Sequence, residues 1–415
     1  MALVIPFRAV RPQKRFARDV ASFPYDVLDR EEGRAIIRDN PLNFLRVEKS
    51  EIDVPEEIPD DDPRVFERAR ENLRRFMRKG VLHQEDRPCF YVYRQKDAAR
   101  QQVGIVGCVS VAEYEAGRIK KHELTRVDKE NERVSHIDTA GAQTGLVFLL
   151  YRARQEIDRI VAGIVEAPPE YDFTTPDGVT HTAWVVGDGE TLGALQREFS
   201  EVECLYIADG HHRAASAATV ARLRRERNPA HTGREEYNFF VATLFPHEQL
   251  KILDYNRAVK DLRGLSVEGF MEKVREKFVL SPGFSERSPS VPHQFGMYLG
   301  GQWYRLEAKP ELYDRADLIG KLDVSILQDH LLGPILGIRD PRTDERITFI
   351  GGVRGMDELE RMVDRRGYAV AFSMCPPGIS ELIAIADAGM IMPPKSTWFE
   401  PKLRSGLFVH LIDEA

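Results

Sequence analysis

"LYIADGHHRAASAATVARLRRER", residues 205–227, decides the local fold and holds the most unusual run of side chains in the sequence. The apolar run 205–208 predicts a short buried strand. Asp209 and Gly210 follow it and predict a tight turn. Four alanines at helical spacing predict a helix over 212–227: Ala214, Ala217, Ala218 and Ala221.

The turn places two histidines and an arginine at the start of that helix. A helix N-terminus carries a partial positive charge and unpaired backbone N–H groups, so cationic side chains do not suit it unless an anion binds there. Gly210 would let the backbone approach such an anion closely, and Arg213 could bind it through two hydrogen bonds. We therefore expect a phosphate-binding turn formed by Gly210, His211, His212 and Arg213.

Two other interpretations of the turn stay open. In the simpler one, Asp209 caps the helix and the histidines are merely exposed. In the other, Asp209, His211 and His212 bind a metal ion, because all three are ligand types. Adjacent histidines on a helix point about 100° apart, and no HExxH motif accompanies them, which favours the anion over the metal.

The composition limits the class of protein. The chain has 415 residues, 42% of them hydrophobic, and a formal charge of −7, so we expect a globular protein without general affinity for nucleic acid or membranes. No apolar run is long and uninterrupted enough for a membrane span. The cysteines lack metal or disulfide spacing and suit a reducing cytoplasm: Cys89, Cys108, Cys204 and Cys375.

The order of predicted elements favours an α+β, or mixed α/β, fold. A hairpin is expected from residues 89–95 and 102–114, and a helix from residues 63–80. Helices at 189–199 and 212–227 interleave with further strands, so a regular doubly wound sheet is not expected. The expected strands are 145–151, 181–187, 204–208, 238–246 and 406–412. We predict a core domain at 1–265, a smaller α/β domain at 266–365, and a C-terminal segment, 366–415, that returns to the site.

A dense basic segment, 117–136, follows the hairpin. It is either a solvated charged helix or a phosphate-binding lobe in which one carboxylate, Glu123, lies among cations. In the second case Glu123 can take a proton from an attacking hydroxyl, while the cations stabilise the transferred group. The candidate charge partners are Lys121, His122, Arg126, Lys129 and Arg133.

A proline-rich loop near the C-terminus, "MPPKSTWFEPKLRSG" (392–406), is the third candidate. It either contacts a ligand or anchors the C-terminus through its aromatic pair. Its candidate substrate residues are Lys395, Ser396, Thr397, Trp398 and Lys402. Neither GxGxxG nor GxxxxGK[ST] occurs in the chain, so a Rossmann site or a P-loop is not expected.

Five motifs together resemble a large prokaryotic family known only as a domain of unknown function. They are "FPYDV", "KKHELT", "YIADGHHRAA", "YNR" and "MPPKSTWFEPK", and they extend over essentially the whole chain. The DGHHR element is also similar to the phosphate-binding turn of the ParB and sulfiredoxin-like fold, which includes free-serine kinases. That resemblance implies a ParB/sulfiredoxin-like core embedded in a larger chain, with Asp209 to Arg213 as the phosphate turn and Glu123 as the catalytic glutamate.

The resemblance implies phosphoryl transfer more than the other activities of that fold. The sulfiredoxin cysteine is replaced by His211, and the chain lacks the helix-turn-helix module of a partitioning protein. We therefore expect a cytoplasmic enzyme that transfers a phosphoryl group from ATP or ADP, with Mg²⁺ by analogy, to a small hydroxyl compound such as serine. Asp209 would position the nucleotide or the metal. The alternatives are a nucleotide-binding regulatory protein without chemistry and a metal-dependent hydrolase that uses the DGHH turn.

Overall fold

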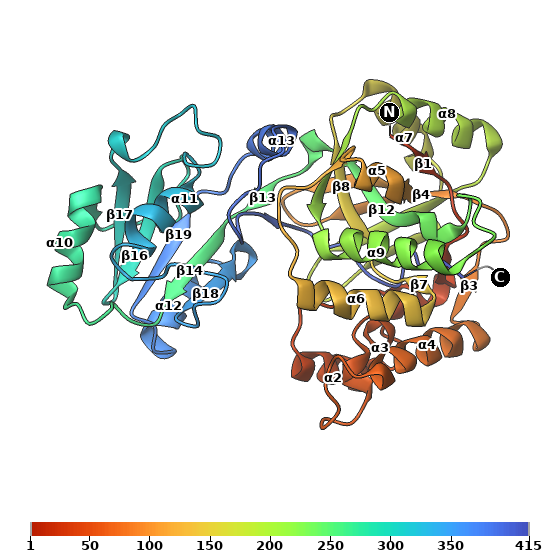
Figure 1. Ribbon diagram of the computed structural model, residues 1–415, viewed down its shortest axis with the longest axis horizontal. Coiled ribbons are helices and arrows are strands. Elements are labelled where there is room, and N and C mark those ends of the chain that lie inside the picture. The colour runs from red at the N-terminus through yellow and green to blue at the C-terminus, as the bar shows by residue number, and fades with distance from the viewer. Residues whose placement is uncertain (1, 414–415) are drawn as a thin grey trace. The chain divides into compact units, whose positions relative to one another are not determined.

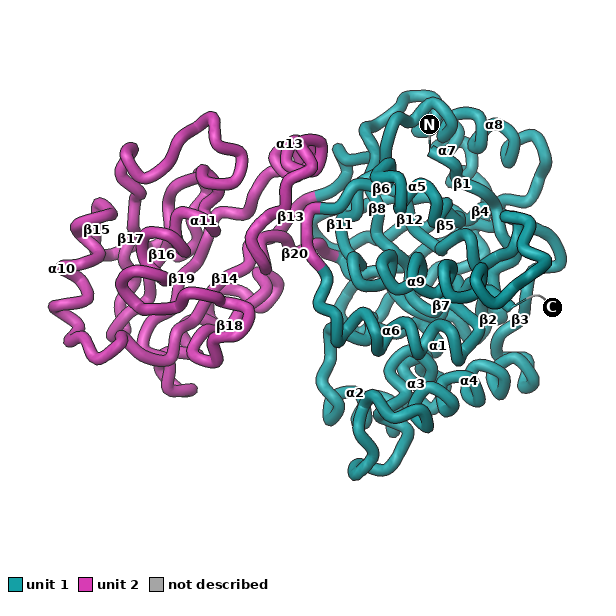
Figure 2. Tube along the Cα trace, in the orientation of Figure 1, with its two compact units in different colours: residues 1–121, 125–250, 401–415 teal, residues 122–124, 251–400 magenta. Residues whose placement is uncertain are grey.

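The computed structural model describes residues 2–413, which form two compact units. Unit 1 comprises residues 1–121, 125–250 and 401–415, and unit 2 comprises residues 122–124 and 251–400 (Figure 2). Both units combine helices with sheets, which confirms the mixed α+β class. The units depart from the expected boundaries at 265 and 365, because strand β14 (Tyr255–Val259) pairs with β18 (Ile347–Gly351) and β19 (Val370–Met374) in one sheet.

Unit 1 is built on a nine-stranded mixed sheet (Figure 1). Its strands run in the order β6-β11-β8-β12-β5-β4-β10-β9, and β1 pairs with β5 outside this path. Their bounds are β1 Val4–Ile5, β4 Phe90–Lys96, β5 Gln101–Ser110, β6 Ile119–Lys120, β8 Val147–Tyr151, β9 Tyr171–Thr174, β10 Thr180–Val186, β11 Leu205–Asp209 and β12 Phe239–Pro246. Two further pairs are β2 (Val10–Pro12) with β3 (Leu82–Gln84), and β7 (Ala142–Gln143) with β21 (His410–Leu411).

The expected hairpin forms from β4 and β5, which pair antiparallel as predicted. Side chains alternate along β4 because successive residues of a strand point to opposite faces. Phe90 and Val92 join the main apolar core, whereas Tyr91 and Tyr93 pack on Phe408 from the returning C-terminal segment. That segment forms only the short strand β21, because most of 406–412 runs as irregular chain.

The helices of unit 1 follow the predicted apolar spacing. Asp62 caps the start of α4 through its side chain, which accepts from the Arg64 N–H, and the chain turns away at Gly80 with a φ of 64°. α9 forms as predicted, buries its alanines in the main apolar core, and lies alongside α6 (Figure 1). The helices are α1 Ala17–Val20, α2 Arg30–Asp39, α3 Leu45–Glu48, α4 Pro63–Arg78, α5 Val111–Glu115, α6 Val127–Ala140, α7 Gln155–Val165, α8 Gly189–Ser200 and α9 His211–Arg227, with short turns η1 Lys14–Phe16, η2 Ser50–Asp53, η3 Glu236–Asn238 and η4 His247–Gln249.

Unit 2 contains a six-stranded antiparallel sheet in the order β15-β17-β16-β19-β14-β18. The helix α12 packs on one face of this sheet, where Leu359 and Met362 contact an apolar cluster that includes Trp303. The remaining strands are β13 Ile252–Leu253, β15 Phe278–Pro282, β16 Gln294–Leu299, β17 Gln302–Ala308 and β20 Trp398–Phe399; β13 and β20 form a separate pair. The helices are α10 Val267–Lys277, α11 Asp323–Leu327, α12 Met356–Arg365 and α13 Ile379–Asp387, with turns η5 Pro310–Leu312, η6 Gln328–Leu332 and η7 Gly352–Arg354.

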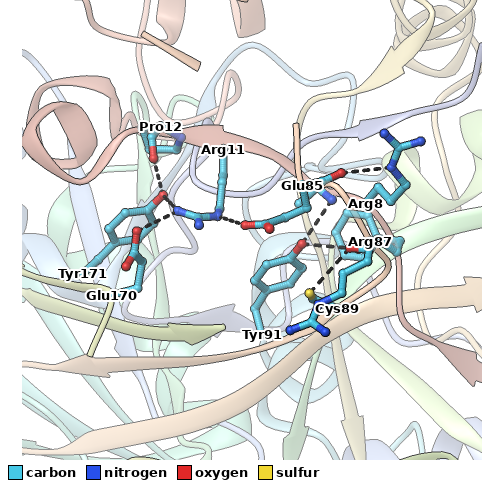
Figure 3. A network of polar contacts seen from close by, with 11 residues as sticks. Arg8, Arg11, Pro12, Glu85, Arg87, Cys89, Tyr91, Glu170 and Tyr171 are labelled. Atoms are coloured by element: carbon cyan, nitrogen blue, oxygen red, sulfur yellow. Dashed lines mark hydrogen bonds and ion pairs between the residues drawn. The ribbon is translucent and has the colours of Figure 1, made fainter. Parts of the chain in front are cut away.

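Buried charges in unit 1 are neutralised locally, and Arg11 is the clearest example (Figure 3). Its guanidinium pairs with Glu85 and with Glu170, the latter at 2.9 Å, and donates to the Tyr171 hydroxyl at 2.8 Å. Tyr171 in turn donates to the carbonyl of Pro12. An arginine that is 8% exposed is thus surrounded by opposite charge.

Two sequence expectations concern cysteines and membranes. All four cysteines are free thiols, and three of them are buried. Between residues 2 and 413, the helices are too short or too polar to cross a lipid bilayer.

Candidate functional site

The predicted turn forms at the end of β11, where the sheet gives way to α9. Gly210 has a φ of 92°, a left-handed conformation that favours glycine, and it stands directly before the first helical residue, His211. α9 runs for 17 residues. The N–H groups of its first turn have no acceptor within the helix, so this terminus presents donors and a partial positive charge.

Asp209 lies between two cations of unit 1. Its Oδ2 is 3.3 Å from the Lys402 ammonium and 3.7 Å from the Arg213 guanidinium, and its Oδ1 accepts from the Gly210 N–H at 3.0 Å. Burial alone would raise the pKa of Asp209, but Lys402 and Arg213 hold it well below the usual value. Asp209 is therefore an ionised carboxylate that holds Lys402 beside the turn.

The two histidines take different positions. His211 is buried at the first position of α9. His212 is half-buried, and its Nε2 accepts a hydrogen bond from the Arg126 N–H at 3.0 Å. That nitrogen of His212 therefore acts as an acceptor, and His212 joins the turn to the residue that precedes α6.

Arg213 points into the core of unit 1. It donates to the carbonyl of Leu146 and faces the buried carboxyl of Glu48, which accepts from Thr144. Burial raises the pKa of Glu48, while Arg133 and Arg213 act in the opposite direction. Gly145 makes this packing possible, because a Cβ there would meet Glu48 Oε1 at 2.8 Å.

The basic segment divides into an exposed part and a buried part. Arg126 pairs with Asp128 at 2.7 Å and Lys129 pairs with Glu132 at 2.8 Å, both on the surface of α6, as the solvated-helix interpretation expects. Lys121 is also exposed, and its ammonium is 5.4 Å from the Tyr114 ring centroid.

Arg133 is the buried part of the segment, and it joins the group around Arg213. It donates to the carbonyl of Glu48 at 3.2 Å, and its guanidinium carbon is 4.2 Å from the Tyr25 ring centroid. The structure therefore brings Arg133 and Arg213 together around Glu48. Sequence reasoning missed Glu48, since nothing in its local pattern marks it as buried.

His122 and Glu123 belong to unit 2, where the C-terminal loop contacts His122. The His122 carbonyl accepts from the Met392 N–H at 2.8 Å, and its Nε2 lies 3.3 Å from the Thr397 hydroxyl. His122 is buried and Glu123 is half-buried. His122 of the "KKHELT" motif and Thr397 of the "MPPKSTWFEPK" motif are thus neighbours within unit 2.

The rest of this loop has defined contacts in each unit. In unit 2, the Ser396 hydroxyl donates to the Pro393 carbonyl at 2.5 Å, and the Trp398 indole donates to Glu400 at 3.0 Å. Lys395 is exposed. In unit 1, Lys402 reaches Asp209 and its carbonyl accepts from Gln95 at 2.9 Å. The loop therefore contributes to the surroundings of two predicted motifs, one in each unit.

The donor set around Gly210 fits an anion better than a cation. The helix terminus, Arg213 and Lys402 supply positive charge, and a phosphate is the anion that such a turn commonly binds. Mg²⁺ does not fit at Asp209, because both carboxylate oxygens already accept from protein donors and two cations lie beside it.

Comparison with solved structures finds similar chains at low identity. Free serine kinase in complex with AMP has 12% identity over 70% of this chain and 86% of that chain, with a TM-score of 0.36. A conserved hypothetical protein from Pyrococcus furiosus has 12% identity over 70% and 89%, with a TM-score of 0.35. SbnI with a C-terminal truncation, from Staphylococcus aureus, has 12% identity over 71% and 82%, with a TM-score of 0.37.

A family model identifies the family to which the chain belongs. No curated protein is similar enough in sequence to count as a match. Residues 4–325 match the family described as "Protein of unknown function (DUF1015)", which covers well over half of the chain and agrees with the resemblance drawn from the five motifs. This protein is therefore a member of the DUF1015 family.

Proposed function

We propose that this protein transfers a phosphoryl group from a nucleotide to the hydroxyl of a small metabolite. The observation that carries the proposal is the turn at Gly210, where a left-handed glycine opens a long helix beside the cations Arg213 and Lys402. Such a terminus stabilises a phosphate through backbone N–H groups and charge. Because the free serine kinase was solved in complex with AMP, a nucleotide is the first ligand to test.

Each element of the site has a proposed role. Gly210, His211, His212 and Arg213 bind the phosphates of ATP or ADP, and Asp209 holds Lys402 and Arg213 in place. Lys121 and His122, which precede Glu123 in the sequence, stabilise the transferred group. Arg126 and Lys129 instead stay paired with Asp128 and Glu132, and Arg133 stays at Glu48. The C-terminal loop binds the acceptor, with serine the leading candidate, through Lys395, Ser396, Thr397, Trp398 and Lys402.

Glu123 is the proposed general base. Its carboxylate takes the proton of the acceptor hydroxyl as the acceptor oxygen forms a bond to phosphorus and the bond from phosphorus to the nucleotide oxygen breaks. In the sequence, Glu123 stands three residues before Arg126. The Arg126 N–H donates to His212, a residue of the turn.

Two measurements on the full chain test the proposal. The first is thermal unfolding with ATP, ADP, pyrophosphate, phosphate and divalent metals, since a ligand that binds only the folded state raises Tm. The second is ³¹P NMR of the nucleotide with serine and other hydroxyl compounds. We expect a nucleotide-dependent rise in Tm and a phosphorylated acceptor.

Substitutions separate the roles. Glu123→Gln should keep the nucleotide-dependent Tm rise and lose transfer by about a hundredfold or more, whereas Glu268→Gln, on the exposed start of α10, should change neither. Lys402→Met should reduce the Tm rise. If the protein binds nucleotide without transferring phosphate, and Glu123→Gln does not change this binding, a regulatory protein is indicated instead. A Tm rise with metal alone would favour the hydrolase.

A further inference from the structure

Arg257, in β14 of unit 2, is a buried cation without an anionic partner. It is 4% exposed. Its guanidinium donates to the carbonyl of Tyr255 and, at 3.0 Å, to the carbonyl of Lys395, and its central carbon lies 5.2 Å from the Phe349 ring centroid. Among residues 2–413, no carboxylate forms an ion pair with it.

This situation differs from every other buried arginine of the described chain. Burying a cation without an opposite charge is costly, and proteins normally supply the partner. Burial lowers the pKa of Arg257 to about 10, which reflects the lack of a compensating carboxylate. The other buried arginines each face one: Arg11 faces Glu85 and Glu170 (Figure 3), Arg133 faces Glu48, Arg213 faces Asp209, and Arg404 faces Asp177.

A second cation and a strained backbone accompany Arg257. Lys395 has a φ of 57°, a left-handed conformation that costs energy for a residue with a side chain. Its ammonium lies 5.6 Å from the Tyr255 ring centroid. Tyr255 packs edge-on against Phe349 at 6.0 Å and Trp398 at 5.1 Å, so the two cations lie against one aromatic cluster.

We propose that Arg257 and Lys395 form a binding site for a small carboxylate. A carboxylate matches the planar fork of the guanidinium and would replace the Lys395 carbonyl as its acceptor, which would release the strained loop. The aromatic surroundings favour a singly charged carboxylate over a more strongly hydrated phosphate.

The site is made of unit 2 residues alone and does not require a nucleotide. If the acceptor binds here, it is a hydroxy acid or hydroxy amino acid, an assignment that rests on the proposed function. Carboxylate binding is measured without nucleotide. A failure of the proposed phosphoryl transfer therefore leaves this result unchanged, and a failure of carboxylate binding is observed independently of transfer.

Isothermal titration of the full chain tests the site with matched pairs of probes. L-Serine is compared with ethanolamine, and glycolate with ethylene glycol, because each pair differs in the carboxylate group. Inorganic phosphate is titrated in parallel. We expect at least one carboxylate to bind and its counterpart to bind at least tenfold more weakly.

Variants of the two cations show whether the carboxylate binds at this site. Arg257→Met and Lys395→Met should each weaken carboxylate binding, by about tenfold or more for the buried guanidinium. Lys273→Met, an exposed lysine on α10, is the matched control and should bind as the native protein does. If Arg257→Met does not fold, Lys395→Met still tests the site, because that lysine is exposed. No carboxylate binding at tens of millimolar, equal binding of the decarboxylated probes, tighter binding of phosphate, or unchanged affinity in Lys395→Met would overturn the proposal.

Discussion

Replacing Asp323 with asparagine should make unit 2 less sensitive to pH. Asp323 begins α11 and is buried, with its Oδ1 accepting from the His293 N–H at 2.7 Å. Its Oδ2 has no hydrogen-bond partner among the described residues, and it borders a cavity of about 20 Å³ that Glu381 and Cys375 also line. Burial, aided by the charge of Glu381, raises its pKa from 3.8 to about 7 despite the His293 N–H.

The size of the effect follows from that shift. A rise of about three pKa units corresponds to about 4 kcal/mol of differential stability, at about 1.4 kcal/mol for each unit. The folded state favours the protonated carboxyl, so protonation of Asp323 adds its full contribution to the free energy of unfolding below about pH 4. This contribution decreases as the pH rises from about 4 to 7, and it is absent above about pH 7. Asparagine keeps an acceptor for the His293 N–H and does not titrate.

Hydrogen exchange of β19, in the interior of the unit 2 sheet, measures this difference. If these amides exchange through unfolding of the unit, the ratio of native to variant exchange rates should rise about tenfold for each pH unit between about pH 4 and 7, and then level off. Comparing the two proteins at each pH removes the intrinsic pH dependence of exchange. Asp357→Asn, at an exposed position on α12, is the control and should show a constant ratio. A constant ratio in Asp323→Asn, or a less stable variant at pH 8, would refute the reasoning.

Two further substitutions test unit 1. Gly210→Ala should lower stability by about 1 kcal/mol or more, because the left-handed φ of 92° disfavours any side chain, and an unchanged Tm would contradict the turn geometry. Arg11→Met should cost about 3 kcal/mol in chemical denaturation, because it leaves Glu85 and Glu170 without their cation. Arg64→Met, at an exposed helix start, should leave the denaturation midpoint nearly unchanged. Equal effects of the two arginine variants would show that the network in Figure 3 contributes little.

The local features of the turn could be predicted from the sequence. The strand 205–208, the glycine turn and the alanine face of α9 all follow from residue spacing, and the structure contains each of them. The β4–β5 hairpin follows from strand patterning in the same way. These features depend on neighbouring residues, which a sequence pattern records directly.

The long-range features could not be predicted. Lys402 reaches Asp209 across 193 positions, and no local pattern links the two. Glu48 is buried where α3 meets Arg133 of α6, Gly145 and Arg213, which are distant from it in the sequence. The predicted domain boundary at 265 differs from the observed one for a similar reason, since β14 finds its partners about ninety to a hundred and ten residues later, in β18 and β19.

The return of the chain to unit 1 at residue 401 has a consequence for synthesis. As the ribosome moves from the N-terminus, residues 251–400 are synthesised before the last strand of unit 1, β21. Unit 1 must therefore wait for Lys402, Phe408 and Ile412, which reach its turn and its core. The sequence of unit 2 is complete at residue 400, so a released chain truncated there would keep every strand of unit 2 but would lack β21 of unit 1.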